Sequence, residues 1–135
     1  MNIEKQLFEF IVNLIKYEDI NYYFQNLDIL DKNSCGIFLL GNSAVYRSIS
    51  NLNYKQYSNK LTINLNTDET LEGFEFGYIY GEYINNIFSK ISNVYITSHI
   101  FINNISIDTN SIYLGKREQG INKFSYNFTI YYSII

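Results

Sequence analysis

The feature that most constrains the fold is the end of the chain, where a glycine-bounded loop leads into a long alternating segment. The loop runs from Gly115 to Gly120. Every second residue after it is apolar: Phe124, Tyr126, Phe128, Ile130, Tyr132 and Ile134. The residues between them are mostly polar: Lys123, Ser125, Asn127, Thr129, Tyr131 and Ser133. Successive side chains of a strand point to opposite faces. The segment therefore predicts a strand that completes a sheet, with one face against a core.

Composition predicts one globular domain, residues 1–135. Of the 135 residues, 47% are hydrophobic and 17% are charged, which is not the balance of a disordered chain. The chain has 14 Tyr and 10 Phe but no Trp. Tyrosine combines an apolar ring with a polar tip, so it suits half-buried sheet faces and protein interfaces. The formal net charge of −3 argues against a protein that coats nucleic acid, which needs a clustered basic surface.

Cysteine content and the start of the chain indicate the compartment. Cys35 is the single cysteine, so an internal disulfide is excluded and a reducing compartment is expected. Glu4 and Lys5 precede an amphipathic pattern rather than a long apolar run. We therefore expect neither a signal peptide nor a membrane span, and no membrane partner.

Hydrophobic periodicity predicts the remaining elements. Apolar residues from Ile3 to Ile15 recur at helical spacing, so an amphipathic helix is expected to end near residues 17–19. Residues 20–30 show no period, and residues 31–34 are typical of a turn. Residues 41–59 lack a pattern and are predicted to form a long loop. Strands are predicted at 35–40, 61–66, 94–102 and 105–114, before the final segment.

A second helix is predicted from Glu69 to about Ile91, after capping residues at 67–70. Gly73, Gly77 and Gly81 share its apolar face. Each glycine costs a helix about 1 kcal/mol relative to alanine, so this stripe predicts close packing against a backbone, most simply the sheet. Together the elements indicate an α+β fold: a mostly antiparallel sheet of four to five strands with two main helices packed on one side.

Acidic residues gather on the opposite side of this helix and have two interpretations. They are Asp68, Glu72, Glu75 and Glu82. One interpretation is a solvent-exposed face. In the other, the same face repeated around a ring lines a lumen whose negative charge lets DNA slide past.

Residues capable of chemistry are sparse. His99, the single histidine, lies in a predicted strand, and Cys35 has no neighbouring base, so structural roles are favoured for both. No His or Cys spacing fits a metal site, and the glycines fit no phosphate-binding or dinucleotide-binding motif. We therefore expect no catalytic residue, metal or cofactor.

The order of elements and the closing segment carry a resemblance. An amphipathic helix is followed by the strand 36–40, a loop, the strand 61–66 and a long helix. The ending joins the glycine loop Leu114–Gly120 to the strand Phe124–Phe128. In these features the chain resembles the small tail-terminator, or minor capsid, proteins that join head and tail in bacteriophages of Gram-positive hosts.

The resemblance implies a structural virion protein without enzymatic activity. Such proteins form a ring, typically a hexamer, that caps the tail tube and joins it to the neck or connector. They assemble in the bacterial cytoplasm, and DNA only passes through them. Carried onto this chain, the resemblance makes two loops and the last strand candidate interfaces with a neighbouring subunit or partner. The residues concerned are Tyr46, Arg47, Tyr54, Tyr57, Lys116, Arg117, Glu118, Gln119, Lys123, Ser125 and Asn127. Tyr and Arg are enriched at interface centres, which fits this role.

Three alternatives remain open on the sequence. The chain could be another neck or head-completion subunit of the same particle. It could be a monomeric α+β module that binds a small ligand or a peptide in an apolar pocket. The final strand could also be an internal core strand that contacts no partner.

Overall fold

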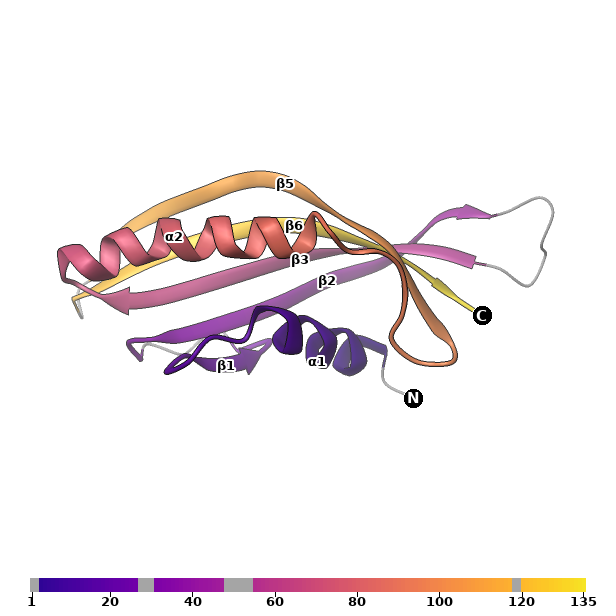
Figure 1. Ribbon diagram of the computed structural model, residues 1–135, viewed down its shortest axis with the longest axis horizontal. Coiled ribbons are helices and arrows are strands. Elements are labelled where there is room, and N and C mark those ends of the chain that lie inside the picture. Colours follow the sequence, from indigo (N-terminus) through magenta and orange to yellow (C-terminus); the bar gives the residue numbers. More distant parts are fainter. Residues whose placement is uncertain (1–2, 27–30, 48–54, 118–119) are drawn as a thin grey trace.

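The computed structural model describes residues 3–26, 31–47, 55–117 and 120–135, without the side chains of residues 42–47, 55, 110 and 117 (Figure 1). In chain order the elements are α1 (Ile3–Ile15), β1 (Asn21–Phe24), β2 (Ser34–Arg47), β3 (Lys55–Asp68), α2 (Leu71–Phe88), β4 (Ser92–Tyr95), β5 (Ile100–Arg117) and β6 (Ile121–Ile134).

The described strands form a single sheet in the order β1-β2-β3-β6-β5-β4. β1 pairs parallel to β2, and every other pair is antiparallel. This confirms the α+β class and the mostly antiparallel sheet. The predicted four to five strands were too few, because the described residues form six. The two strands that differ from the predicted pattern, β1 and β4, have four residues each. Such short strands hold too few residues to display a period of two.

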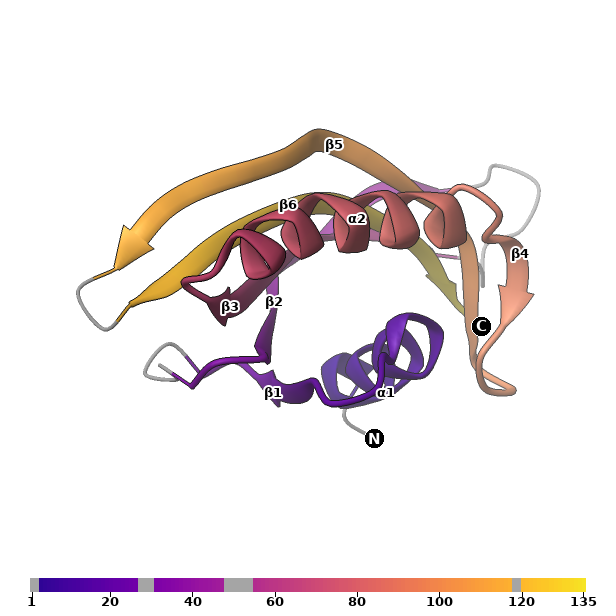
Figure 2. The same cartoon turned by 60° about the vertical axis from the view of Figure 1, so that its left-hand side comes forward.

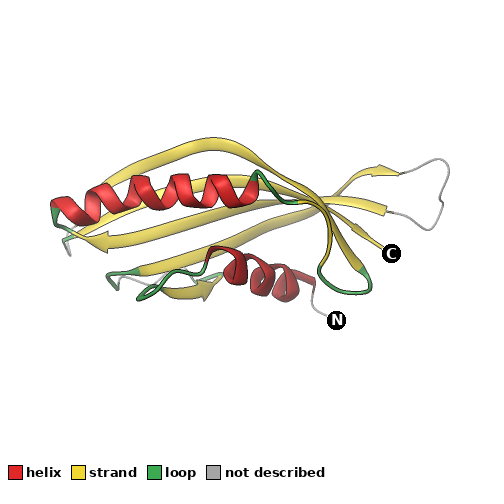
Figure 3. Cartoon of the chain, in the orientation of Figure 1, coloured by secondary structure: helices red, strands yellow, loops and turns green. Residues whose placement is uncertain are grey.

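Both helices lie on the same face of the sheet, as the sequence predicts. Figure 2 shows the sheet curving around α2 and α1, and Figure 3 shows the long strands continuing beyond the helices. The core between these layers is closed by fully buried residues from both helices and from the central strands, such as Ile11, Ile84, Ile63 and Tyr126. No helix among the described residues lies on the opposite face of β2, β3, β6 and β5 (Figure 2).

The glycine stripe of α2 packs against the sheet, which confirms the prediction. A Cβ atom at Gly77 would overlap the Phe124 ring of β6, and one at Gly81 would overlap Ser111 of β5. At Gly73 it would overlap the Asp68 carbonyl at the end of β3. The three glycines therefore allow close approach of α2 to β3, β6 and β5: to the Asp68 backbone at Gly73, and to side chains of the sheet at Gly77 and Gly81.

The final strand lies at the centre of the sheet. β6 pairs with β3 along its whole length and with β5 on its other side. Its apolar face is buried as predicted, but on the polar face Ser125, Thr129 and Ser133 are buried too. These small side chains are shielded by longer neighbours on both flanking strands, which only a central strand has.

One predicted loop and one predicted break between strands belong largely to strands in the structure. β2 continues to Arg47 and β3 begins at Lys55, so of the predicted loop 41–59 only residues 48–54 lie outside strands, and these are not among the described residues. β5 runs through Asn103 and Asn104 with a register shift there. Conversely, residues 96–99 interrupt the predicted strand 94–102 and join β4 to β5, so His99 is exposed in a connection. Register shifts in β2 and β5 break the strict alternation that the prediction relied on.

The C-terminal end of α1 is tied to the other layers by tyrosine hydroxyls. Tyr80 of α2 donates a hydrogen bond to the Ile15 carbonyl at 2.9 Å, and its oxygen lies 2.6 Å from the Tyr22 hydroxyl of β1. The backbone N–H of Tyr17 donates to Tyr22 at 2.9 Å. The last carbonyls of a helix have no partner within it, so these hydroxyls complete the end of α1.

The buried tyrosines predict a loss of stability at high pH. Burial raises the pKa of Tyr22 and of Tyr132 from 10.0 to about 12, and it raises the pKa of Tyr80 and Tyr126 as well. The folded state thus resists loss of these protons. The contribution of these tyrosines to stability should be constant below pH 10 and should fall as pH rises from 10 through 12.

Alkaline titration checks this expectation. Tyrosinate absorbance at 295 nm and far-ultraviolet circular dichroism are followed together from pH 8 to 13. A group of tyrosines should ionise only in the transition in which the dichroism is lost. Ionisation of all 14 tyrosines before any change in dichroism would contradict the burial of these hydroxyls.

Candidate interaction surface

The face of the sheet opposite the helices is a surface that the described residues leave without a covering layer. It is built by the side chains of β2, β3, β6 and β5 that alternate with the core residues. Its centre is polar and already hydrogen-bonded across strands. Thr62 donates to Asn127 at 2.9 Å, and Lys60 donates to Thr129 at 3.0 Å. Cross-strand pairs of this kind hold the face in one arrangement.

Asp108 on β5 extends this polar network to the third strand. Its carboxylate accepts a hydrogen bond from Thr129 at 2.7 Å and lies 3.3 Å from the Lys60 ammonium. The Lys60 side chain is 66% exposed, so the ion pair contributes little to stability and leaves the lysine accessible. Asn127 also donates to Thr109 at 3.3 Å. The network therefore runs from β3 across β6 to β5.

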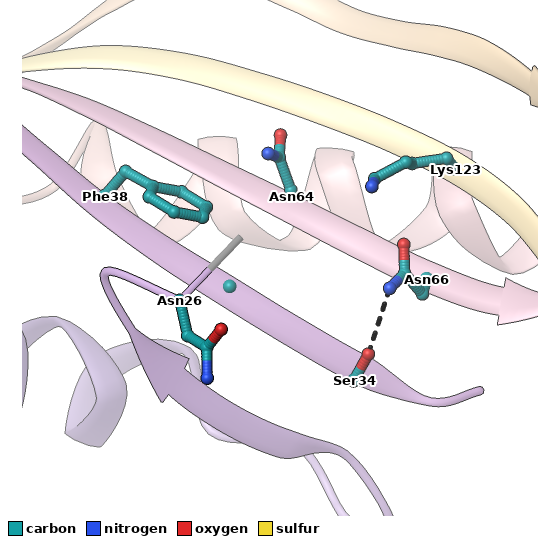
Figure 4. A pocket seen from close by; sticks show the side chains of 7 residues that line it. Asn26, Ser34, Phe38, Asn64, Asn66 and Lys123 are labelled. Carbon is teal, nitrogen blue, oxygen red and sulfur yellow. Dashed lines mark hydrogen bonds between the residues drawn. The ribbon is translucent and has the colours of Figure 1, made fainter. Parts of the chain in front are cut away.

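Of the predicted contact residues on the last strand, all three lie on this face. Ser125 is buried, and Asn127 is half-buried within the network. Lys123 is half-buried and lines a small cavity near the end of the face with Asn64, Asn66 and Ser34 (Figure 4). The Asn66 amide donates to Ser34 at 3.1 Å there. The cavity volume of about 30 Å³ suits one water molecule, not an organic ligand.

Apolar side chains flank the polar centre. Leu40 on β2 is 58% exposed. On β5, Ile112 and Leu114 are 41% and 42% exposed, and they flank Tyr113, whose ring packs on Phe124 in the core. Strand alternation therefore places Ile112 and Leu114 on the uncovered face. Sequence reasoning missed these positions, although the alternation of Ile112 and Leu114 with Tyr113 was a readable signal.

The predicted contact region around the long loop is divided by the structure. Tyr46 and Arg47 belong to β2 and pair with Gln56 and Lys55 of β3. Tyr54 lies outside the described residues. Tyr57 is half-buried and stacks on Tyr132 with ring centroids 5.7 Å apart, so its ring is used inside the subunit.

The glycine-bounded loop is a hairpin between β5 and β6, as predicted. Gly115 and Gly120 have φ of +96° and +72°, which glycine adopts without strain. Lys116 is exposed and lies 3.2 Å from Glu69, which connects the hairpin to the start of α2. Arg117 ends β5, and Glu118 and Gln119 lie outside the described residues.

The predicted acidic face is only partly a single surface. Glu72, Glu75 and Glu82 are exposed on the outer side of α2, beside Ile79, which is 59% exposed. Asp68 instead accepts a hydrogen bond from the Thr70 N–H at 3.1 Å and another from the Thr70 hydroxyl. These bonds lower the pKa of Asp68. Thr70 in turn caps α2 through the Gly73 N–H. Asp68 thus supports the start of the helix.

Groups capable of covalent or metal chemistry are scattered. Within the described ranges no cluster of three His, Cys, Asp or Glu side chains is found. Cys35 is fully buried in β2, and burial raises the pKa of its thiol. None of the described helices is long and apolar enough to cross a membrane.

Comparison of the chain with models of known protein families and with curated protein sequences finds no match.

Proposed function

We propose that the protein is a structural subunit of a tailed phage or of a phage tail-like particle. Copies of it assemble into a ring, a hexamer by the family resemblance, at the head-proximal end of the tail. The ring terminates the tail tube and joins it to the neck or connector. The protein carries out no catalysis and needs no cofactor.

The observation that carries this proposal is the sheet with one uncovered, ordered face. Ser125, Thr129 and Ser133 are buried on it without any covering layer, and exposed apolar residues flank them. A surface that is both fixed by hydrogen bonds and partly apolar is suited to contact another protein. The cavity on this face holds no more than a water molecule, so the face itself suits contact with another protein rather than binding of a small ligand.

The outer side of α2 is the proposed lumen surface. Glu72, Glu75 and Glu82 are exposed and share one side of the helix. In a ring their charges would repeat with the symmetry, and a DNA backbone would be repelled rather than bound. This surface would take no part in folding, because none of the three carboxylates is buried.

Native mass spectrometry of the purified protein, alone and mixed with isolated tail tubes, tests the proposed function. We expect a closed oligomer of one size, in either condition, and electron microscopy should show it at one end of the tubes. Binding to isolated connectors but not to tubes would favour a head-completion subunit instead. A protein that stays monomeric with tubes and with connectors would overturn the proposal.

A further inference from the structure

The sheet has two long edges that its outer strands leave uncovered. β4 pairs with β5 only between Phe101 and Asn104. Along Ile105–Arg117, no strand among the described residues pairs with the outer edge of β5. β1 pairs with β2 only at Ser34–Ile37.

Beyond the end of β1, a side chain covers the outer edge of β2 as far as Leu39. Gln25 donates to the Leu39 carbonyl at 3.1 Å and accepts from the Leu39 N–H at 3.0 Å, so its amide imitates one more residue of β1. From Ser43 to Arg47 no described strand pairs with this edge. The described sheet therefore presents one uncovered edge on each side.

Uncovered edges of this length are templates for another strand, because a row of backbone N–H and C=O groups lies open. The side chains along the β5 edge favour contact as well. Ile107, Ile112 and Leu114 are 41–42% exposed. Two of the three charged residues on this edge, Asp108 and Lys116, each form an ion pair within the subunit, and the third, Arg117, lies at its end.

We infer that the β5 edge of one copy, Ile105–Arg117, pairs with the β2 edge of the next copy, Ser43–Arg47. This inference rests on the proposed ring and names the contact that closes it. The occupant of each edge is thus a second copy of this chain.

Strand direction supports this pairing. β2 is antiparallel to β3, β3 to β6, and β6 to β5, so β2 and β5 of one copy run in opposite directions. Rotation about a ring axis keeps the direction of each strand along that axis. β5 of one copy and β2 of the next therefore meet antiparallel, and the alternation continues from copy to copy. A head-to-tail contact of this kind closes into a ring, whereas a two-fold β5–β5 contact stops at a dimer.

The covering strands are placed so that they do not obstruct this contact. Ser43–Arg47 of β2 pair with β3 residues that in turn pair with residues 131–134 of β6, so we call them level with those residues. Ile105–Arg117 of β5 pair directly with β6 and are level with its residues 130–121. The two uncovered edges thus lie at opposite ends of the sheet, and the neighbouring copy must be shifted along the strands. Such a stagger is the shear of a closed barrel, whose strands tilt relative to its axis.

The size of the shift follows from β1. β1 is level with residues 123–126 of β6, and β5 ends level with Ile121. A shift of about six to eight residues, roughly 20–26 Å, moves β1 of the neighbour, and the Gln25 side chain that covers Leu39 level with residue 128, beyond the end of β5. The same shift places Ser43 level with residues 125 to 123, the partners of Ile112 and Gly115, and leaves β4 beyond Arg47.

Disulfide cross-linking between two single-cysteine variants tests the contact. Ser43→Cys and Ile112→Cys are purified separately, mixed and oxidised, with Ala44→Cys, Thr109→Cys and Leu114→Cys covering the neighbouring registers. Cys35 stays in place because it is fully buried. We expect a cross-linked dimer from a β2 variant mixed with a β5 variant, and none from either alone. Asn86→Cys on the exposed side of α2 should give no product with Ser43→Cys.

The outcomes separate this inference from the proposed function. A double variant should give a ladder of cross-linked products that ends at the ring size seen by native mass spectrometry. Cross-linking of Ile112→Cys with itself would show a two-fold β5 contact and overturn the inference. Intact rings with no cross-link at any scanned pair would also overturn it, while the proposed function would stand. Absence of rings, with and without tail tubes, would remove both.

Discussion

Replacing Gly77 with alanine is expected to lower the free energy of unfolding by about 1–3 kcal/mol, the usual cost of overpacking a core. Helix propensity alone predicts the opposite sign, because alanine is favoured over glycine within a helix by about 1 kcal/mol. Packing decides the sign here. The added methyl group would overlap the Phe124 ring, which is fully buried and held by Phe74, Tyr78 and Tyr113. These three ring contacts restrict how far the Phe124 ring can move.

Urea unfolding followed by circular dichroism measures this effect, with Asn86→Ala as the control. Asn86 is exposed on the same helix, so its replacement should leave stability unchanged or raise it slightly. Adding Phe124→Leu to Gly77→Ala should recover part of the loss, because the smaller side chain leaves room for the methyl group. A Gly77→Ala protein as stable as the wild type would show that α2 does not pack this closely on the Phe124 ring of β6.

The glycine stripe shows what the sequence could predict. Three glycines at four-residue spacing have a cost in an isolated helix, so their presence already required a close neighbour. The sequence therefore predicted that α2 packs closely on a sheet, and the structure adds which strand lies under each glycine. The strict alternation of residues 124–134 likewise predicted a long strand and its core face.

The two strands whose length sequence reasoning underestimated share a physical cause. β5 changes register with β6 at four places, so its side chains do not alternate over its whole length. β2 continues past Leu40 with two register shifts. A pattern search for a period of two ends at each bulge, although the backbone pairing continues. The long edges on which assembly is proposed were hidden for this reason.

Some residues predicted to form an exposed contact surface are instead used within the subunit, and this has another cause. A residue type that favours interfaces, such as Tyr57, can be used within the subunit, and here it stacks on Tyr132. Asp68 was grouped with an acidic face but supports the start of α2 through Thr70. The residue type at one position does not reveal such side-chain contacts, because the partner is distant in sequence or belongs to a helix cap.

Replacing Tyr80 with alanine is expected to have the largest effect on stability, a loss of about 3–5 kcal/mol, as for other large-to-small core substitutions of aromatic residues. The side chain is fully buried, and its ring contacts Phe76, Tyr17 and Tyr83. Its loss would leave a cavity between α1, α2 and the sheet, because these backbones cannot close over it. Domains are only marginally stable, so such a loss removes a large fraction of the free energy of unfolding.

Tyr80→Phe separates the hydroxyl from the ring. It keeps the volume but removes the hydrogen bond to the Ile15 carbonyl and the contact with the Tyr22 hydroxyl, so a loss of about 1–2 kcal/mol is expected. Tyr83→Phe is the matched control, because that tyrosine is half-buried in the same aromatic cluster and its hydroxyl makes no hydrogen bond with a described residue. Equal unfolding energies for Tyr80→Phe and the wild type would show that the hydroxyl does not hold the end of α1. A small loss in Tyr80→Ala would instead mean that α1 packs on the sheet without this side chain, since the cavity would then have closed.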